Sequence, residues 1–159
     1  MNLSGIGYDV HRFITDRPLI LGGVEIPHSH GLDGHSDADV LVHAIADAVL
    51  GAIGEHDIGF HFPNTDESIR GISSLEILRK SAALVRERGG RINNIDATLI
   101  AQAPKIGPHV EQMRVNLAEA LSIEPRRVGV KATTNEGMGF IGRGEGIAAM
   151  AVASVESPD

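Results

Sequence analysis

The alternation of hydrophobic and polar residues predicts several strands. It is clearest along residues 3–13, where Ile6, Tyr8 and Val10 recur at every second position. Residues 19–26 form two short apolar runs around a Gly-Gly pair, which predicts a hairpin because glycine adopts the positive φ of tight turns. Further strands are predicted at residues 92–103, 128–134 and 147–155.

Helical periodicity and end signals predict three helices, at residues 38–53, from Ser73 to Gly89, and from Pro108 to Leu121. Ser36 or Asp37 is the candidate N-cap of the first helix. Ser73 and Glu76 have the spacing of a capping box at the start of the second. Pro108 suits the first position of the third helix.

The order of these elements predicts an α+β fold. Four or more strands are interleaved with three helices irregularly, so we expect a mixed sheet with the helices packed on one face. The length of 159 residues fits one domain, residues 1–159. Residues 54–72 form a long polar connection without periodicity, which we interpret as a functional loop.

Composition and charge narrow the class of partner. The net charge of −7 argues against nucleic acid. The absence of cysteine excludes disulfides and thiolate metal sites. No apolar run has the length of a membrane span, so we expect no membrane partner and a cytoplasmic location, with a mature plastid form as the alternative. With four Phe and one Tyr, the core must use smaller side chains, which favours an oligomer.

Residues 18–69 combine metal-binding side chains with an unusual lack of basic ones. They hold six of the eight histidines and nine Asp or Glu, but no Lys or Arg. Imidazoles and carboxylates gathered without a counter-charge indicate a site for a metal cation.

Three of the candidate ligands have a spacing that allows them to meet. Asp9 and His11 are two residues apart on a strand and share a face, and His43 lies in the first predicted helix. Three such ligands with a fourth position open are typical of catalytic zinc or a similar ion. Asp39 or Asp47, four residues from His43, is the candidate acceptor for its other ring N–H. The alternative is a coincidence of surface residues.

A glycine-rich segment, residues 137–146, predicts an anion-binding loop, because backbone N–H groups can approach a phosphate closely there. Thr133, Thr134 and Arg143 add donors. The segment contains the string of a dinucleotide-binding fingerprint, but more glycine follows it and not a helix, so we reject that match. A mobile surface loop is the alternative. Lys105, in the turn after the strand at 92–103, faces either a ligand or solvent in an ordinary connection.

Several segments together resemble one family, the 2-C-methyl-D-erythritol 2,4-cyclodiphosphate synthases of the non-mevalonate isoprenoid pathway. The similarity runs in order from about residue 5 to residue 153. It is carried by Gly7-Tyr8-Asp9-Val10-His11, His35-Ser36-Asp37-Ala38-Asp39, Asp57-Ile58-Gly59, Phe62-Pro63-Asn64-Thr65-Asp66, Ala101-Gln102-Ala103-Pro104-Lys105 and Lys131-Ala132-Thr133-Thr134.

The resemblance implies an activity and an assembly. The family cyclises 4-diphosphocytidyl-2-C-methyl-D-erythritol 2-phosphate and releases CMP, in homotrimers with active sites between subunits. It implies Zn²⁺ held by Asp9, His11 and His43, and Mg²⁺ or Mn²⁺ held on the diphosphate with the help of Glu136.

The resemblance also assigns substrate contacts. His35 and Thr134 would stabilise the transition state. The methylerythritol phosphate part would contact His35, Ser36, Asp57, Gly59, Phe62, Asn64, Thr65 and Asp66. The cytidine diphosphate pocket would be lined by Ala101, Ala103, Pro104, Lys105, Ile106, Gly107, Thr133 and Asn135. Phe140 and Arg143 would line a cavity near the trimer axis. Asn64 and Asn135 depart from the usual Asp and Thr, which affects single hydrogen bonds only.

Two other functions use the same residues. A zinc-dependent hydrolase would need Asp57 or Glu136 as a general base near the open metal position. A non-catalytic metal or nucleotide sensor would bind CMP or CDP without turnover.

Overall fold

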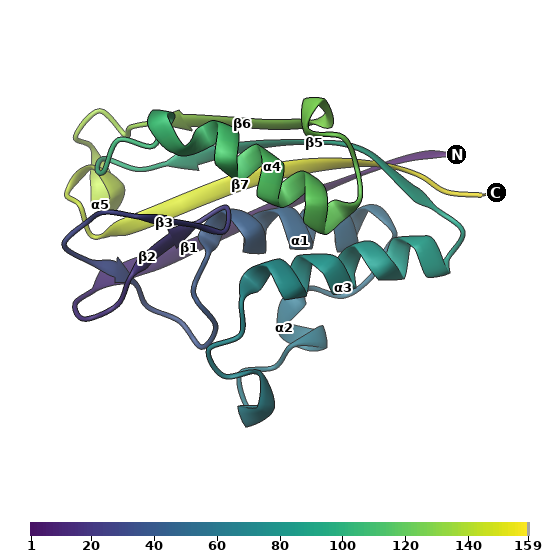
Figure 1. Ribbon diagram of the computed structural model, residues 1–159, viewed down its shortest axis with the longest axis horizontal. Coiled ribbons are helices and arrows are strands. Elements are labelled where there is room, and N and C mark those ends of the chain that lie inside the picture. The colour runs from purple at the N-terminus through teal and green to yellow at the C-terminus, as the bar shows by residue number, and fades with distance from the viewer. Residues whose placement is uncertain (159) are drawn as a thin grey trace.

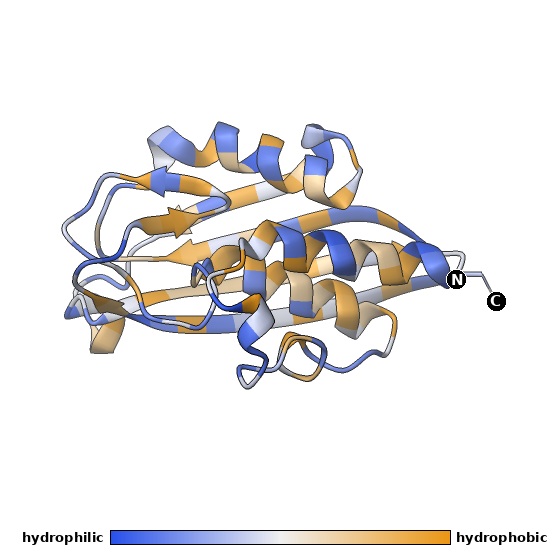
Figure 2. Ribbon diagram, turned by 60° about the horizontal axis from the view of Figure 1, so that its bottom comes forward, coloured by the Kyte–Doolittle hydropathy of each residue, from blue (hydrophilic) through white to orange (hydrophobic). Residues whose placement is uncertain are grey.

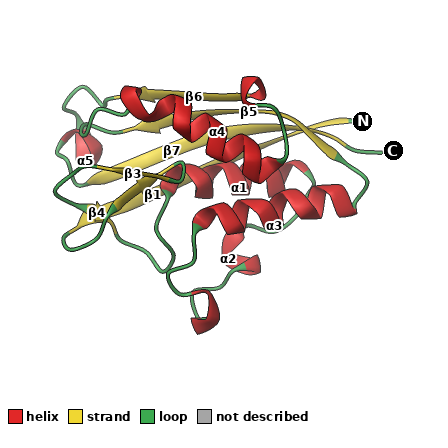
Figure 3. Cartoon of the chain, in the orientation of Figure 1, coloured by secondary structure: helices red, strands yellow, loops and turns green. Residues whose placement is uncertain are grey.

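The computed structural model describes residues 1–158, in which helices cover one face of a five-stranded sheet (Figures 1 and 3). The strand order is β4-β1-β7-β5-β6. The strands are β1 (Asn2–Ile14), β4 (Gly31–Leu32), β5 (Arg91–Ile100), β6 (Val128–Thr133) and β7 (Gly146–Glu156). Only β5 and β6 pair in parallel, and the other neighbours are antiparallel. The predicted mixed sheet is therefore confirmed.

The first strand has the predicted alternation, but Ile6, Tyr8 and Val10 point away from the helices. Ile6 and Tyr8 are exposed, whereas Gly5 and Gly7, which alternate with them, are buried under α1. Two successive inward-facing positions of β1 are thus glycine, and Asp9 follows on the same face.

Three main helices lie on one face of the sheet, as predicted: α1 (Val40–Ala52), α3 (Ser74–Glu87) and α4 (Val110–Leu121). α1 packs against β1, β7 and α3. Because it is enclosed on several sides, it is apolar around nearly its whole circumference. α3 and α4 carry mixed hydrophobic and hydrophilic residues (Figure 2), as expected for helices with one face in solvent.

Glycines in β1 allow α1 to approach it closely. A Cβ atom on Gly7 would lie 1.9 Å from the carbonyl oxygen of Ala44, and one on Gly5 would lie 2.1 Å from that of Ala48. Any larger residue would have to push the helix backbone off the strand. The short distance between β1 and α1 therefore requires glycine at positions 5 and 7.

The predicted hairpin is present, with β2 (Leu19–Leu21) paired to β3 (Val24–Ile26). Gly22 and Gly23 both adopt positive φ, as the turn required. Their N–H groups donate to the carboxylate of Asp39 at 2.9 and 2.7 Å, and Asp39 also accepts from the N–H of Val42. One buried carboxylate thus caps α1 and anchors the hairpin to it.

The predicted helix ends need correction. Neither Ser36 nor Asp37 caps α1, because Ala38 takes a left-handed conformation with φ of 57° and delays the helix. Ser73 is the N-cap residue of α3, but its side chain makes no capping hydrogen bond. Pro108 lies in a separate 3₁₀ turn before α4.

Residues 54–72 are more structured than predicted, since they contain the short helix α2 (Ile58–His61) and the 3₁₀ turn η1 (Glu67–Ile69). The glycine-rich segment also forms one helical turn, α5 (Gly139–Gly142), where the sequence predicted none. The remaining 3₁₀ turns are η2 (Gly107–His109) and η3 (Pro125–Arg127). Within residues 1–158, no helix has the length and apolar character that crossing a membrane requires.

The close contact of β1 with α1 predicts opposite effects of two glycine substitutions. Gly7→Ala should destabilise the fold by ~3 kcal/mol or more, because its methyl group overlaps the helix backbone. Gly51→Ala, in α1, should be neutral or stabilising by up to ~1 kcal/mol, because the nearest atom to its Cβ is 3.8 Å away. Urea unfolding of both variants measures the difference; equal stabilities would contradict the assigned packing.

Candidate metal centre

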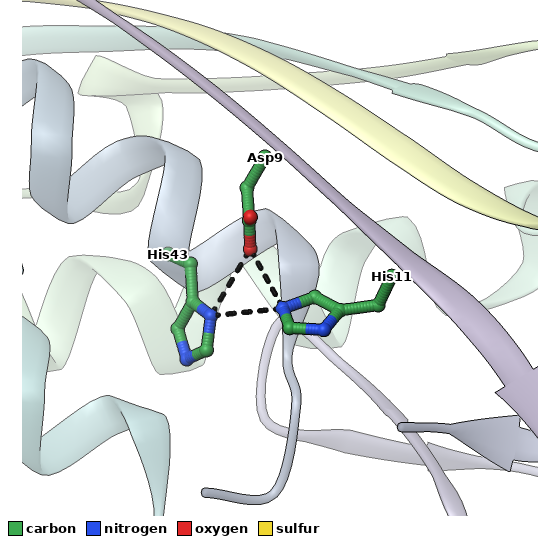
Figure 4. A group of neighbouring side chains, drawn as sticks. All are labelled: Asp9, His11 and His43. Carbon is green, nitrogen blue, oxygen red and sulfur yellow. Dashed lines mark hydrogen bonds and ion pairs between the residues drawn. The ribbon is translucent and has the colours of Figure 1, made fainter. Parts of the chain in front are cut away.

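Asp9 and His11 project from one face of β1, and His43 faces them from α1 (Figure 4). The Oδ2 atom of Asp9 lies 2.9 Å from Nε2 of His11 and 3.1 Å from Nδ1 of His43. The two ring nitrogens are 3.3 Å apart. The predicted convergence of these three groups is present in the structure.

The far nitrogen of His11 determines what the near one offers. Its Nδ1 lies 2.6 Å from the carbonyl oxygen of Asp33. A carbonyl oxygen only accepts hydrogen bonds, so Nδ1 carries a proton and the neutral ring presents the Nε2 lone pair to the cluster.

The far nitrogen of His43 has different partners from those predicted. Its Nε2 lies 2.8 Å from Oγ of Ser74 and 3.1 Å from Oγ of Ser36. The expectation that Asp39 or Asp47 would support this ring is wrong. Asp39 serves the hairpin and the start of α1, and Asp47 accepts the first backbone N–H of α2 at 2.8 Å.

The electrostatics of the three side chains favour the binding of a cation. Burial favours the neutral form of Asp9, but the hydrogen bonds and positive charge of His11 and His43 outweigh it and lower its pKa to about 2. Burial acts to lower the pKa of His11, but the hydrogen bond and charge of Asp9 and the contacts with Asp33 raise it overall. Asp9 thus stays ionised and attracts positive charge, which a divalent metal ion supplies once His11 is neutral.

The three donor atoms fit a tetrahedral ion. Bonds of about 2.0–2.2 Å to nitrogen and oxygen in a tetrahedron separate neighbouring donors by roughly 3.3–3.6 Å. The observed separations of 2.9, 3.1 and 3.3 Å are at or somewhat below this range, so the side chains would move apart slightly around an ion. Among the described residues, no fourth His, Asp or Glu joins this group. One coordination position is left for water or a reactant.

A hollow opens beside the cluster and collects several predicted substrate residues. His35, Ser36, Gly59, Phe62 and Asn64 all line it together with the three candidate ligands. His35 is steadied by a 3.2 Å contact between its Nε2 and the carbonyl oxygen of Asp66. The loop at residues 54–72, which the sequence predicts to be functional, therefore lines part of this hollow.

Three other predicted substrate residues of this loop do not line the hollow: Asp57, Thr65 and Asp66. Asp57 caps α2 by accepting the N–H of Phe60 at 3.0 Å. Asp66 caps η1 and accepts from both the N–H and the hydroxyl of Ser68. In the described chain, both carboxylates hold the loop in shape.

The predicted cytidine diphosphate residues gather at a separate hollow, at the ends of β5 and β6. It is lined by Ala101, Pro104, Lys105, Ile106, Gly107, Thr133 and Thr134, among others, but not by Ala103. This hollow shares no lining residue with the one beside the metal cluster. One copy of the chain therefore does not bring the two predicted halves of the site together.

The remaining predicted residues lie in the turns after β6. Asn135 donates to the carbonyl oxygen of Met138, and Glu136 is exposed with φ of 53°. Arg143 pairs with Glu145 at 2.8 Å, so its guanidinium already has an anionic partner. Phe140 lines a third hollow, which includes His11.

Sequence reasoning missed the residues that support the ligands. Asp33 contributes a backbone oxygen, which any residue type would supply, so the sequence carries no signal for it. Ser74 lies 31 positions from His43 and looked like an ordinary first residue of a helix. Apolar residues of the metal hollow were also missed: Ile58, Ile69, Ile72 and Ile77.

Comparison with known proteins gives a consistent result. A model of the YgbB family matches residues 3–156. The 2-C-methyl-D-erythritol 2,4-cyclodiphosphate synthase of Akkermansia muciniphila is 61% identical over 158 residues, which are 99% of this chain and 94% of that protein.

Solved structures agree. The bifunctional IspDF from Campylobacter jejuni has a TM-score of 0.95 and 43% identity; the match covers 100% of this chain but only 43% of that longer chain. IspF from Plasmodium falciparum, in complex with CDP, has a TM-score of 0.86 and 32% identity over 99% of this chain and 97% of its own. The chain therefore belongs to the YgbB family, of which the 2-C-methyl-D-erythritol 2,4-cyclodiphosphate synthases are members.

Proposed function

We propose that this chain cyclises 4-diphosphocytidyl-2-C-methyl-D-erythritol 2-phosphate to 2-C-methyl-D-erythritol 2,4-cyclodiphosphate and releases CMP. The proposal is supported by the family and by the synthase relative from Akkermansia muciniphila. The observation that carries it is the meeting of Asp9, His11 and His43 beside a hollow, with no fourth ligand among the described residues.

The reaction is an intramolecular phosphoryl transfer. An oxygen of the 2-phosphate forms a bond to the β-phosphorus, and the bond from that phosphorus to CMP breaks. The attacking oxygen is already anionic, so no general base is needed and positioning supplies much of the acceleration. Zn²⁺ at the Asp9 cluster would polarise phosphate oxygens, and Mg²⁺ or Mn²⁺ held with Glu136 would offset charge on the diphosphate.

The residues around the metal hollow would orient the methylerythritol phosphate part. His35 and Ser36 line it, together with Gly59, Phe62 and Asn64 of the loop at residues 54–72. The contact of His35 Nε2 with the carbonyl oxygen of Asp66 holds the imidazole ring in place. A ring held in this way could contact the reacting phosphate. Asp57, Thr65 and Asp66 would contribute to substrate binding indirectly, by maintaining the conformation of the loop.

The hollow at residues 101–107 and 133–134 would bind the cytidine diphosphate part. A CDP complex of the Plasmodium falciparum relative supports a nucleotide ligand for the family fold. Thr134 lines this hollow, where it would donate to the transferring phosphate, and Lys105 adds positive charge. Asn135, Glu136 and Arg143 follow in the adjoining turns.

An active site shared between copies of the chain accounts for the separation of the two hollows. We propose a homotrimer in which the metal hollow of one copy meets the cytidine hollow of the next. The sheet face away from the helices supports association, since it exposes the cross-strand pairs Ile6–Val152 and Tyr8–Met150. Contiguous exposed apolar side chains of this kind are typical of protein interfaces.

Hydrolysis of the same substrate is the competing reaction. It would need a general base beside the metal cluster. Asp57 caps α2 and does not line the metal hollow, and Glu136 is the residue proposed to hold the second metal ion. Turnover in isotopically labelled water separates the reactions, because hydrolysis places solvent oxygen in the products and cyclisation does not. Labelled products would contradict the proposed function, as would CMP or CDP binding without turnover.

Removing one candidate ligand tests the metal centre. His43→Ala should weaken zinc binding by more than about 100-fold and abolish CMP release. The loss should exceed about 100-fold because mutating a residue that only supports a metal ligand already costs up to about 100-fold in affinity. Elemental analysis of the purified protein and a CMP-release assay measure both. His28→Ala, a histidine that does not line the metal hollow, is the control. Full zinc content in His43→Ala would refute the site.

Glu136 should act through the second ion. Glu136→Gln removes a charged metal ligand and should lower the rate of CMP release roughly 100-fold while the zinc content stays unchanged. The rate loss should be partly reversed by raising the Mg²⁺ or Mn²⁺ concentration. Loss of zinc in this variant would place Glu136 in the other metal site.

The exposed sheet face should be needed for assembly and activity. Val152→Glu places a charge among its apolar pairs and should convert the protein to monomers with little CMP release. Val115→Glu is the matched control, since both valines are 47% exposed and Val115 lies on α4. Light scattering during gel filtration gives the mass. A Val152→Glu protein that keeps the mass of the unsubstituted one would contradict this interface.

A further inference from the structure

A buried polar chain lies behind His43, on the side away from the metal cluster. Nε2 of His43 is 2.8 Å from Oγ of Ser74, and Ser74 donates its hydroxyl proton to Oδ1 of Asp37. Ser74 is fully buried and His43 nearly so. The order of the three groups is imidazole, hydroxyl and carboxylate.

The direction of the protons in this chain follows from the acceptor at its end. A carboxylate only accepts, and Ser74 has a single hydroxyl proton. Because that proton lies toward Asp37, the Ser74 oxygen can only accept from His43. The proton of the neutral ring is therefore on Nε2, and its Nδ1 lone pair faces Asp9 and His11.

The chain is also fixed at its far end. Asp37 accepts the backbone N–H of Asp39 and the backbone N–H of Ser74, each at 3.1 Å. Its carboxylate thus connects the segment before α1 to the first residue of α3. Ser36 adds a second oxygen 3.1 Å from Nε2, and this oxygen accepts the N–H of Ala38.

We infer that Ser74, held by Asp37, is a positioning residue for the metal centre: it fixes the ring and the tautomer of His43 so that Nδ1 is a ready ligand. This inference rests on the proposed metal site. It assigns the start of α3 a role in metal affinity, although neither Ser74 nor Asp37 lines the metal hollow.

Metal affinity tests the inference directly. Zinc is titrated into the metal-free full chain in competition with a chromogenic chelator. Ser74→Ala should bind zinc about 10- to 100-fold more weakly, the usual effect of removing such a partner. Ser81→Ala is the matched control, because Ser81 is an equally buried serine of α3 whose hydroxyl bonds only the Ile77 carbonyl oxygen of its own helix. Its zinc affinity should stay within about twofold.

Two further variants separate positioning from packing. Ser74→Thr keeps the hydroxyl and should retain most of the zinc affinity, whereas a packing role would favour the smaller Ala over the larger Thr. Asp37→Asn keeps an acceptor but removes its charge, and should give an intermediate loss. If Ser74→Ala does not fold, as judged by its thermal unfolding, these two variants decide the question.

The outcomes are distinguishable from those for the metal site itself. Zinc binding in Ser74→Ala as tight as in the unsubstituted protein would overturn the inference, and so would loss of affinity in Ser74→Thr equal to that in Ser74→Ala. If His43→Ala lost zinc while Ser74→Ala did not, the metal centre would stand and only the role of Ser74 would fall.

Discussion

The close approach of α1 to β1 is the constraint on which the candidate metal centre depends. A Cβ on Gly7 would lie 1.9 Å from the carbonyl oxygen of Ala44, so strand and helix touch backbone to backbone. Asp9 and His11 follow on this strand, and His43 precedes Ala44 on the helix. Metal ligands tolerate errors of only about 0.2 Å, so a rigid contact without intervening side chains suits this position. The same contact between β1 and α1 therefore packs the core and sets the distances between the candidate metal ligands.

The sequence predicted those parts of the site that depend on local spacing. Asp9 and His11 share a face because strand residues alternate, and that rule needs no tertiary information. The hydrogen-bond partners of the ligands depend on packing between elements that are distant in the sequence, and local spacing does not predict that packing. Acidic residues four positions from His43 were the natural local guess, but Asp39 caps its helix and Asp47 holds α2. Sequence spacing thus identified the candidate metal ligands but not the residues that hydrogen-bond to them.

The errors at helix ends have the same cause. Ser36 and Asp37 are good capping residues by type, and a local rule assigns them to the nearest helix. In the structure Ala38 turns left-handed, and both side chains instead face the ring of His43 and the start of α3. Positions where strong local preferences are not followed tend to be those where another role has priority. The overall fold was predictable because its strands and helices follow their periodicities, which such exceptions do not disturb.

The net negative charge of the chain makes the separation of the two hollows important for substrate binding. A protein with a net charge of −7 repels a substrate that carries several phosphates unless cations are concentrated at the point of binding. The metal hollow offers a site for one cation, and Lys105 lines the other hollow. The two hollows share no lining residue. If copies join through the exposed sheet face, the burial that stabilises the assembly also brings the two sources of positive potential to one ligand, so an isolated copy would have little affinity for it.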